Sequence, residues 1–416
     1  VSVFAEDDEA CLHTRKSDEA VALQGRGVKA YLDMDQLVAI ARERGCDAIH
    51  PGYGFLAENA VFARRCAEVG IVFIGPAPEV LERFGDKSAA RALAEQNNVP
   101  LVAGINRAIT LDEARAFFNE HGPLMLKAAA GGGGRGIRAV AHESELEEAF
   151  TRCQSEAQSA FGDGELYVER LIERARHIEI QVLGDGTGAV SHLWERDCSL
   201  QRRNQKLLEM APSPSLETRT RDAMIECALA MARSVNYQGL GTFEFLVEAD
   251  QPERFVFMEA NPRVQVEHTV TEEVTGVDLL QAQLQLLAGQ TLAELVLETA
   301  PTPRGLAIQA RVCAETLQAD GTAAPAAGTL TLRRNDDPVE AVDVELAPGT
   351  TRRVAFAETV VTPGQHVFRV GERTVVVTAA ATPTATPTRT GGDGAGFGPL
   401  VALFALAAVV ALARID

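Results

Sequence analysis

The sequence predicts an α/β fold over roughly its first 335 residues, and three observations support this prediction. Helix-like and strand-like stretches alternate along the region, which is typical of a fold with a largely parallel sheet. The chain has 416 residues, enough for about two to three domains. Its composition, 46% hydrophobic and 23% charged, is that of a globular protein and excludes disorder throughout.

Charge and cysteine content exclude several functional classes. The net charge of −19 argues against a chain built to coat nucleic acid, so we expect no nucleic-acid partner. The seven cysteines never form a CxxC pair, which excludes a disulfide scaffold and a thiolate zinc site and indicates a reducing, cytoplasmic compartment. Only five of the 39 basic residues are lysines. We therefore expect the lysines to lie where a compact ammonium group is needed rather than a guanidinium.

The N-terminal elements follow from apolar periodicity and from turn residues. Val1–Phe4 predicts a strand, and Asp33–Gly45 predicts a helix with apolar side chains on one face and a terminal glycine. Glu58–Gly70 predicts a second helix, and Ile71–Ile74 predicts a short strand that ends at Gly-Pro. Between the two helices, Pro51–Phe55 forms a glycine-rich loop.

A glycine run between two predicted strands is the first candidate binding element. Leu124–Lys127 and Ile137–Ala141 flank four consecutive glycines. Without Cβ atoms, the backbone N–H groups of such a tip can close over phosphate oxygens. No Gly-Lys-Ser/Thr follows, so this is not a Walker A loop. The alternative is a flexible hairpin loop, but the neighbouring lysine and arginines favour phosphate.

Two later strands predict a metal site. Residues 241–247 and 255–261 form a hairpin if the turn is centred on Gln251-Pro252. Glu244 and Glu259 lie equally far from that centre, so they would face each other with Cβ atoms about 4.5–5.5 Å apart. Such a pair needs a cation, and Mg²⁺ or Mn²⁺ fits oxygen ligands. The alternative, a solvent-facing acidic pair, is disfavoured by the flanking phenylalanines.

The segment after this hairpin predicts an anion site. Arg263, Gln265 and Glu267 alternate with valines, so an extended chain would aim the three polar side chains one way. A guanidinium beside a carboxylate can hold a small anion and accept its proton. The stretch Glu195–Lys206 is rich in positive charge, although alone it is best explained as a solvated turn.

Together these motifs resemble biotin carboxylase, the ATP-grasp component of acetyl-CoA, propionyl-CoA, pyruvate and related biotin-dependent carboxylases. The resemblance covers residue 1 to about residue 334. The matching stretches are His50–Asn59, Phe73–Pro76, Gly85–Lys87, the glycine loop after Lys127, His177–Gln181, Glu195–Lys206, Glu259–His268 and Thr271–Asp278.

The resemblance implies an α/β (α+β) architecture: an ATP-grasp fold preceded by an incomplete doubly wound N-terminal subdomain. We expect a β-rich segment and a hydrophobic helix after it. The implied domains are 1–83 for the N-terminal subdomain, 84–300 for the ATP-grasp domain with a lid at about 99–171, 301–335 for the start of the C-terminal subdomain, 336–380 for the β-rich segment, 381–396 for a Thr/Pro/Gly linker and 397–413 for the helix.

The resemblance also implies a role for each site residue. The implied ATP-binding residues are Lys87, Lys127, Gly132, Gly133, Gly134, Glu169, His177, Gln201 and Asn204. Glu244, Glu259 and Asn261 would hold two Mg²⁺ or Mn²⁺ ions. Bicarbonate would be bound by Lys206, Arg263, Gln265 and Val266. Lys206, Arg263 and Glu267 would be catalytic, with Glu267 as the base.

The implied reaction attaches CO₂ to biotin. Bicarbonate attacks the γ-phosphate of ATP to form carboxyphosphate, whose CO₂ passes to the ureido nitrogen of biotin. No Met-Lys-Met motif for biotin attachment occurs, so biotin would be carried by another chain or would be free biotin. The other implied partners are a carboxyltransferase subunit and a second copy of the chain in a homodimer.

Departures from the family pattern predict impaired activity. The family's opening Ala-Asn-Arg-Gly-Glu-Ile stretch is missing, and Asn204 stands where the family has histidine. Similarity ends near Arg334, before the family's catalytic arginine and Tyr-Asp-Ser stretch. We therefore expect a chain that is truncated at both ends.

The C-terminal part predicts a foreign tail. Val342–Leu346, Arg353–Phe356 and Arg373–Thr378 predict short strands, and Ala381–Gly396 predicts a linker. The 17 uncharged residues Phe397–Ala413 predict a transmembrane helix, since a bilayer core needs about 20 residues; a buried terminal helix is the alternative. This arrangement resembles the surface-anchoring tail of archaeal secreted proteins.

Three functional hypotheses follow. The first is the biotin carboxylase component of a biotin-dependent carboxylase. The second is a catalytically impaired ATP-binding remnant tethered to a membrane through 397–413. The third, another ATP-grasp ligase such as a carbamoyl-phosphate or purine-pathway enzyme, is disfavoured because Arg263–His268 and His50–Asn59 resemble the biotin branch specifically.

Overall fold

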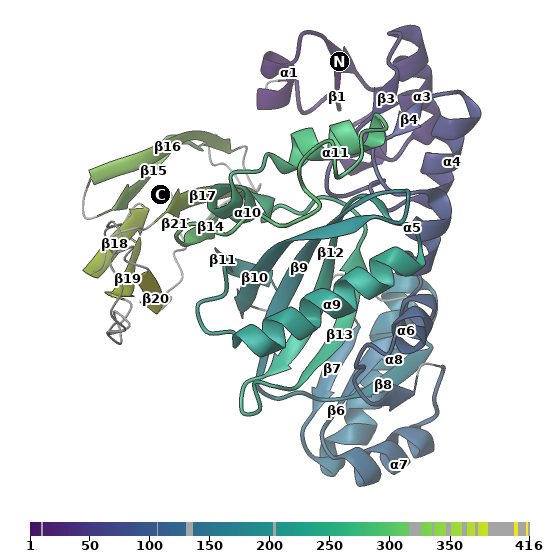
Figure 1. Ribbon diagram of the computed structural model, residues 1–416. Coiled ribbons are helices and arrows are strands. Elements are labelled where there is room, and N and C mark those ends of the chain that lie inside the picture. Colours follow the sequence, from purple (N-terminus) through teal and green to yellow (C-terminus); the bar gives the residue numbers. More distant parts are fainter. Residues whose placement is uncertain are drawn as a thin grey trace. The chain divides into compact units, whose positions relative to one another are not determined.

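The structure, a computed structural model, divides into two compact units (Figure 1). Unit 1 comprises residues 1–192, 217–265 and 280–299, and unit 2 comprises 193–216, 266–279 and 300–416. The described residues are 1–9, 11–105, 107–129, 136–202, 205–315, 326–334, 337–346, 351–359, 364–370, 373–381, 403–406 and 413–414. The domain boundaries expected from the sequence stay a prediction.

Unit 1 begins with two small parallel sheets and five helices. The sheets pair β1 (Ser2–Phe4) with β2 (Ala20–Ala22) and β3 (Ala48–Ile49) with β4 (Val72–Phe73). The helices are α1 (Leu12–Lys16), α2 (Val28–Tyr31), α3 (Met34–Glu43), α4 (Ala60–Glu68) and α5 (Pro78–Gly85).

The two helices predicted in this region are confirmed as α3 and α4. Each begins where a short polar side chain accepts a backbone N–H of the first turn, Asp33 from Gln36 and Asn59 from Phe62. Their apolar faces join one core with Phe73 of β4.

A four-stranded antiparallel sheet, in the order β5-β8-β6-β7, forms the next part of unit 1. Its core contains Leu124, Leu126 and Val168 of the sheet and Phe117 of a covering helix. The hairpin predicted on either side of the glycine run is confirmed, with Lys127 opposite Ile137. The elements are β5 (Gly104–Ile105), α7 (Leu111–His121), β6 (Leu124–Ala128), β7 (Ile137–Val140), η1 (Glu143–Glu145), α8 (Leu146–Phe161) and β8 (Leu166–Arg170).

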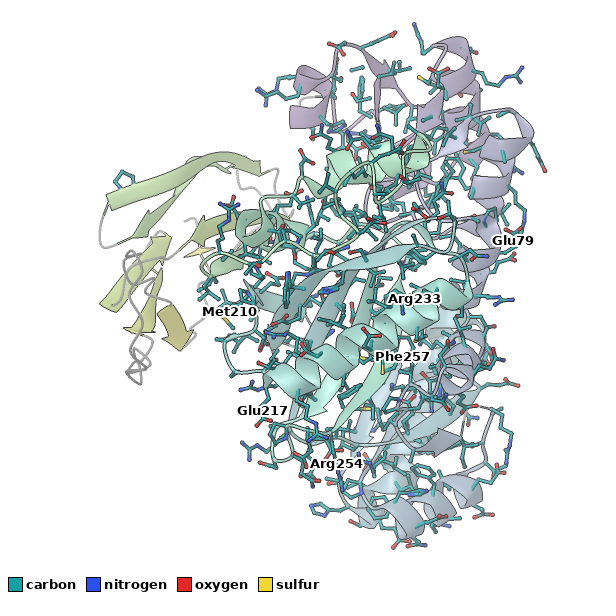
Figure 2. All side chains as sticks on the ribbon, viewed as in Figure 1. Glu79, Met210, Glu217, Arg233, Arg254 and Phe257 are labelled. Atoms are coloured by element: carbon teal, nitrogen blue, oxygen red, sulfur yellow. The ribbon has the colours of Figure 1, made fainter. Side chains whose placement is uncertain are left out.

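Three further antiparallel strands of unit 1 lie in the order β13-β12-β9. One face of these strands is apolar, with Phe243 and Phe245 packed against Phe257, which is 1% exposed (Figure 2). Helices α5, α6 and α9 contact these strands. The elements are α6 (Lys87–Gln96), β9 (Ala175–Asp185), α9 (Thr218–Ser234), β12 (Gln238–Glu248), β13 (Phe255–Asn261) and α11 (Leu279–Leu287).

The predicted hairpin register is confirmed around the two acids. Glu244 pairs with Glu259, and Thr242 pairs with Asn261. A bulge follows, so the register shifts between Glu244 and Phe245. The pairs from Thr242 to Glu244 keep the predicted register. The pairs between the bulge and the turn are shifted by one residue from that register.

The expectation of a largely parallel sheet is wrong for most of unit 1. Parallel pairing joins β1 to β2 and β3 to β4, where an intervening helix allows the crossover. The four-stranded sheet and the β13-β12-β9 strands pair antiparallel. Helix–strand alternation is compatible with both arrangements, because a helix can also leave one strand and return to an antiparallel neighbour.

Unit 2 contains two sheets and one helix among its described residues. One sheet has the order β10-β11-β14-β17 with β21 beside β14, and the other has the order β16-β15-β18-β19-β20. The elements are β10 (Val190–Arg202), β11 (Gln205–Ala211), α10 (His268–Thr275), β14 (Ala307–Glu315), β15 (Ala326–Arg334), β16 (Asp337–Leu346), β17 (Thr351–Thr359), β18 (Gly364–Val370), β19 (Arg373–Ala381), β20 (Leu403–Leu406) and β21 (Ala413–Arg414). The three strands predicted between 342 and 378 are therefore confirmed.

The transmembrane helix predicted for 397–413 lies mostly outside the described residues. Where that segment is described, residues 403–406 form strand β20, so the helix prediction is wrong there. Among the described residues, none of the helices combines the length and the apolar character needed to cross a bilayer. Apolar side chains without charge suit a strand as well as a helix, and composition alone does not separate the two.

Candidate functional site

The polar face of β9, β12 and β13 carries a row of three glutamates, which we call the acidic face. Glu244 pairs across the strands with Glu179 on one side and with Glu259 on the other. Facing residues in one register point to the same side of a sheet, so the three carboxylates share this face. Glu179 is 0% exposed and Glu244 is 3% exposed. Three adjacent carboxylates give this face a surplus of negative charge.

Glu244 lies at the centre of a hydrogen-bond network. One carboxylate oxygen accepts from the side-chain amides of Asn261, at 2.7 Å, and Gln265, at 2.9 Å. The other lies 2.7 Å from Nε2 of His177, and the same ring nitrogen lies 3.6 Å from Glu179. These buried donors thus hold the Glu244 carboxylate in one orientation.

The acidic face has the donor set that a hard divalent cation requires. Burial and the charge of Glu244 raise the pKa of Glu259, while the Lys87 ammonium opposes the shift. Protein atoms crowd around the Glu259 carboxylate, yet its side chain keeps solvent-accessible surface, so an ion could reach it. Carboxylate and amide oxygens of Glu244, Glu259 and Asn261 fit Mg²⁺ or Mn²⁺. A second group, His177, Glu179 and Glu244, brings ligand atoms within 4.8 Å of one another.

Two lysines predicted to bind phosphate converge on one aromatic ring. The Nζ atoms of Lys87 and Lys127 each lie 5.9 Å from the centroid of Tyr167. Burial lowers the pKa of Lys87, and the Lys127 charge contributes in the same direction. Two ammonium groups near one ring attract an anion more strongly than either alone.

Glu169 neutralises part of this positive charge. Its carboxylate pairs with Lys127 and with Nη1 of Arg91, at 3.1 Å. Glu169 is 8% exposed and sits on β8, opposite Met125 of β6. The predicted nucleotide residues Lys127 and Glu169 are therefore brought into direct contact.

Arg263, predicted to bind an anion, is held by one residue far away in the sequence and by one close neighbour. Its Nε donates to Glu58 at 2.5 Å, and its Nη2 donates to Asn261 at 3.1 Å. Asn261 in turn donates to Glu244. Glu58, Arg263, Asn261 and Glu244 thus belong to one connected hydrogen-bond network in unit 1.

The remaining predicted bicarbonate residues lie in unit 2. Nζ of Lys206 contacts the Glu267 carboxylate at 2.7 Å, and Glu267 is 2% exposed. The backbone carbonyl of Val266 accepts a hydrogen bond from Gln309 at 3.5 Å. Gln201, predicted to bind ATP, donates to the carbonyl of Cys198 at 3.0 Å. Gly132, Gly133, Gly134 and Asn204 lie outside the described residues.

Sequence reasoning missed three side chains of this arrangement. Glu179 could have been found, because polar residues alternate with isoleucines from His177 to Gln181. Tyr167 and Glu58 carried no such signal, because their relation to the lysines and to Arg263 depends on packing between distant segments.

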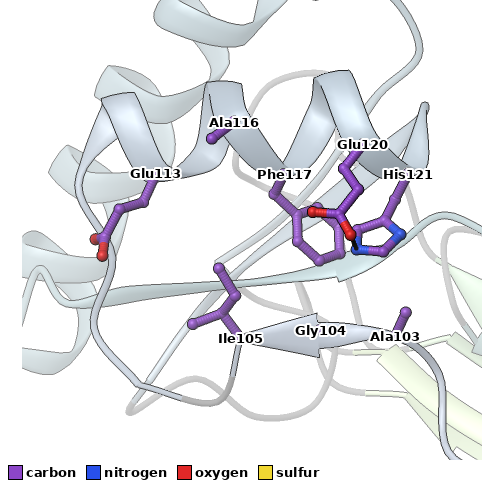
Figure 3. Close-up of a pocket in the computed structure, with 8 residues that line it drawn as sticks. All are labelled: Ala103, Gly104, Ile105, Glu113, Ala116, Phe117, Glu120 and His121. Atoms are coloured by element: carbon purple, nitrogen blue, oxygen red, sulfur yellow. Dashed lines mark ion pairs between the residues drawn. The ribbon is translucent and has the colours of Figure 1, made fainter.

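A pocket of ≈ 430 Å³ lies elsewhere, between α7 and β5 (Figure 3). Its floor includes Ile105 and Phe117, and Glu120 and His121 form an ion pair at its rim. None of its described lining residues is a predicted site residue. We base the candidate site on the acidic face and its neighbouring lysines, because charge and hydrogen bonding converge there.

Two family models match the chain. The N-terminal domain of biotin carboxylase matches residues 1–81, and the ATP-binding domain of the carbamoyl-phosphate synthase L chain matches residues 86–295. Together they cover the part of the chain that holds the acidic face, the lysines and Glu58.

Curated relatives include pyruvate carboxylases. Pyruvate carboxylase 1 of Caenorhabditis elegans is 53% identical over 322 residues, 76% of this chain and 27% of the relative. Pyruvate carboxylase of Bacillus subtilis is 50% identical over 330 residues, 77% of this chain and 28% of the relative. The chain thus spans little more than a quarter of the length of the curated relatives it matches.

Solved structures agree with these matches. A complex of Campylobacter jejuni biotin carboxylase with β,γ-ATP is 35% identical, with a TM-score of 0.73, covering 86% of this chain and 81% of that chain. The biotin carboxylase domain dimer of Hydrogenobacter thermophilus 2-oxoglutarate carboxylase, with MgADP and bicarbonate, is 38% identical, with a TM-score of 0.74, covering 87% and 80%. The chain belongs to the biotin carboxylase family.

Proposed function

We propose that this chain is the biotin carboxylase component of a biotin-dependent carboxylase. It would use MgATP and bicarbonate to carboxylate biotin held on a separate carrier protein. The observation that carries the proposal is the pairing of Glu244 with Glu259 beside Lys87 and Lys127. A paired acid site next to converging ammonium groups suits a nucleotide polyphosphate with its divalent cation.

The nucleotide step rests on charge complementarity within unit 1. Lys87 and Lys127 would bind phosphate oxygens, and Lys127 would exchange its Glu169 partner for phosphate. The divalent cation, Mg²⁺ or Mn²⁺, would be held by Glu244, Glu259 and Asn261. When bound, it would neutralise part of the phosphate charge. In the C. jejuni relative an ATP analogue is bound, which supports this assignment.

The bicarbonate step rests on Arg263 and on the segment that follows it. Arg263 would orient the anion, with Gln265, Val266 and Lys206 as further contacts. Glu267, already ion-paired with Lys206, would accept the bicarbonate proton. A bicarbonate oxygen would then attack the γ-phosphorus, breaking its bond to the bridging oxygen and releasing ADP. The C–O bond of the resulting carboxyphosphate would break to give CO₂ and inorganic phosphate. The biotin nitrogen would give up its proton to the released phosphate as its bond to CO₂ forms.

We infer the protein partners of this chain from the kinds of protein that it resembles. Pyruvate carboxylases and a single-chain acyl-CoA carboxylase contain regions like this chain within longer polypeptides. We propose a biotinylated carrier and a carboxyltransferase, on other chains or domains, as partners of this one. The dimer of the H. thermophilus relative supports self-association as well.

Bicarbonate-dependent ATP hydrolysis, measured on the 416-residue chain with and without free biotin, tests the proposal. Stimulation by bicarbonate and then by biotin is the expected result. Calorimetric binding of MgADP without any turnover would favour an impaired nucleotide-binding remnant instead. Absence of nucleotide binding would contradict both hypotheses.

Replacing Lys206 tests the bicarbonate step separately from the nucleotide step. We expect Lys206→Gln to abolish bicarbonate-dependent turnover while MgADP still binds, because its partner Glu267 is the proposed base and not a proposed nucleotide or metal residue. Lys16→Gln, at an exposed lysine of α1, is the matched control. Unchanged turnover in Lys206→Gln would reject the assigned role.

A further inference from the structure

The loop from His50 to Asn59 matches the family pattern, yet the proposed chemistry gives it no role. Its one charged side chain near the acidic face is Glu58, whose carboxylate accepts from Nε of Arg263 at 2.5 Å. These two residues are 205 positions apart in the chain. Their side chains are 36% and 23% exposed, respectively, so the pair is partly shielded from solvent.

The backbone on either side of Glu58 is fixed. Leu56 and Ala57 are buried, and Asn59 caps α4 by accepting the Phe62 N–H at 2.8 Å. At the other end of the loop, the His50 ring accepts from the Gly52 N–H at 3.0 Å and lies 3.2 Å from Gln283. Glu58 therefore lies on a segment that is held in place at both ends, as a positioning residue requires.

The bond from Arg263 to Glu58 determines which part of the guanidinium remains available. The guanidinium has five N–H groups in one plane. Among the described residues, Nε donates to Glu58, Nη2 to Asn261 and Nη1 to the Val264 carbonyl at 3.3 Å. One N–H on each terminal nitrogen is left, and these groups can donate to an oxyanion.

We propose that Glu58 is a positioning residue for bicarbonate. By holding Nε on one side, it keeps the two remaining N–H groups of Arg263 directed toward the anion. Without this acceptor the guanidinium can rotate about its flexible stem, and part of the binding free energy is spent on ordering it. This inference rests on the proposed function, because it concerns the anion that Arg263 binds there.

Two substitutions at Glu58 separate the effect of its hydrogen-bond acceptor from the effect of its negative charge. Glu58→Ala removes the acceptor, whereas Glu58→Gln keeps an acceptor oxygen and removes the charge. We expect Glu58→Ala to raise the KM for bicarbonate about tenfold, the cost of one charged hydrogen bond, with the KM for ATP unchanged. Glu58→Gln should stay within about threefold of wild type because a neutral acceptor retains part of that bond.

The matched control is Glu82→Ala. Glu82 also pairs with an arginine, Arg64, at 2.6 Å, but its side chain is 54% exposed and neither residue is a proposed site residue. We expect its bicarbonate KM to equal that of wild type. Thermal unfolding of all variants, and MgADP binding by calorimetry, check that Glu58→Ala does not act through a general loss of structure.

A double-mutant cycle with Arg263→Lys completes the test. If Glu58 acts through Arg263, Glu58→Ala adds little to the bicarbonate defect of Arg263→Lys. An unchanged bicarbonate KM in Glu58→Ala would overturn the inference and leave the proposed function standing. An equal defect in Glu58→Gln, or a parallel loss of MgADP binding, would overturn it too. Wild-type protein that neither hydrolyses ATP with bicarbonate nor binds bicarbonate beside MgADP would instead overturn the proposed function, and this inference with it.

Discussion

Unit 1 carries two antiparallel sheet faces whose charges are balanced in opposite ways. On the four-stranded sheet, the carboxylate of Glu169 contacts both Lys127 and Arg91. On the acidic face, three glutamates stand side by side and Glu244 is held by neutral amides and by His177. The first face sets one carboxylate against two cations and keeps positive charge for an anion, whereas the second has negative charge left over for a ligand cation.

This difference in charge balance predicts whether substitutions on each face affect stability, nucleotide binding or both. Pairing with Glu169 keeps Lys127 ordered, and Glu169 would retain its Arg91 partner when Lys127 turns to a phosphate. The acidic face cannot neutralise itself, because adjacent carboxylates repel and the sheet backbone prevents their separation. We expect substitutions on the acidic face to affect both stability and nucleotide binding, and substitutions on the four-stranded sheet to affect mainly binding.

The largest effect is expected for Glu244→Ala. The change leaves the buried amides of Asn261 and Gln265 without their acceptor and removes a proposed metal ligand. We expect the free energy of unfolding to fall by roughly 3 kcal/mol, and MgADP binding to disappear. Urea denaturation and calorimetry measure the two effects.

Glu248→Ala is the control at the other end of the same strand. Glu248 pairs with Arg170 at 2.5 Å, away from the acidic row. Its substitution should cost about 1 kcal/mol or less and leave MgADP binding intact. Equal losses of nucleotide affinity in the two variants would remove the distinction between the acidic face and the rest of β12.

A smaller and more selective effect is expected for Lys127→Gln. We expect MgADP affinity to fall about tenfold, because one charged contact to phosphate is lost. The free energy of unfolding should change by less than about 1 kcal/mol. Arg152→Gln, in an exposed pair with Glu148 on α8, is the control that should alter neither quantity. A large loss of stability with normal affinity would make Lys127 a structural residue.

The smallest effect is a pH dependence from Glu259. Its pKa is raised, first by burial and then by Glu244, so the folded protein binds this proton more tightly than the unfolded chain. The stabilising contribution is therefore complete below the unfolded pKa and is lost as pH rises through the raised value. Because Mg²⁺ favours the ionised form, it should weaken this dependence.

Urea midpoints between about pH 5 and pH 8, with EDTA or with Mg²⁺, measure this contribution. Wild type should lose more stability with rising pH than Glu259→Gln does, and the difference should shrink in Mg²⁺. Identical pH profiles for the two proteins in EDTA would show that Glu259 does not carry a raised pKa.

Much of the site follows from local rules. The pairing of Glu244 with Glu259 could be predicted because a hairpin fixes its register from the turn and a strand repeats every two residues. The helix starts at Asp33 and Asn59 could be predicted because capping depends on residues within one turn. The largely parallel sheet could not, because helix–strand alternation does not specify which edge of a sheet each strand joins.

The sequence by itself determined the family motifs, the hairpin with its opposed acids and the lysine before the glycine run. Each of these depends on neighbours within about one hairpin. The tertiary structure decided that β9 lies beside β12 and completes the row with Glu179, that Lys87 and Lys127 meet at Tyr167, and that Glu58 holds Arg263. These contacts join segments far apart in the chain, and only packing, which selects strand order and helix placement, brings such segments together.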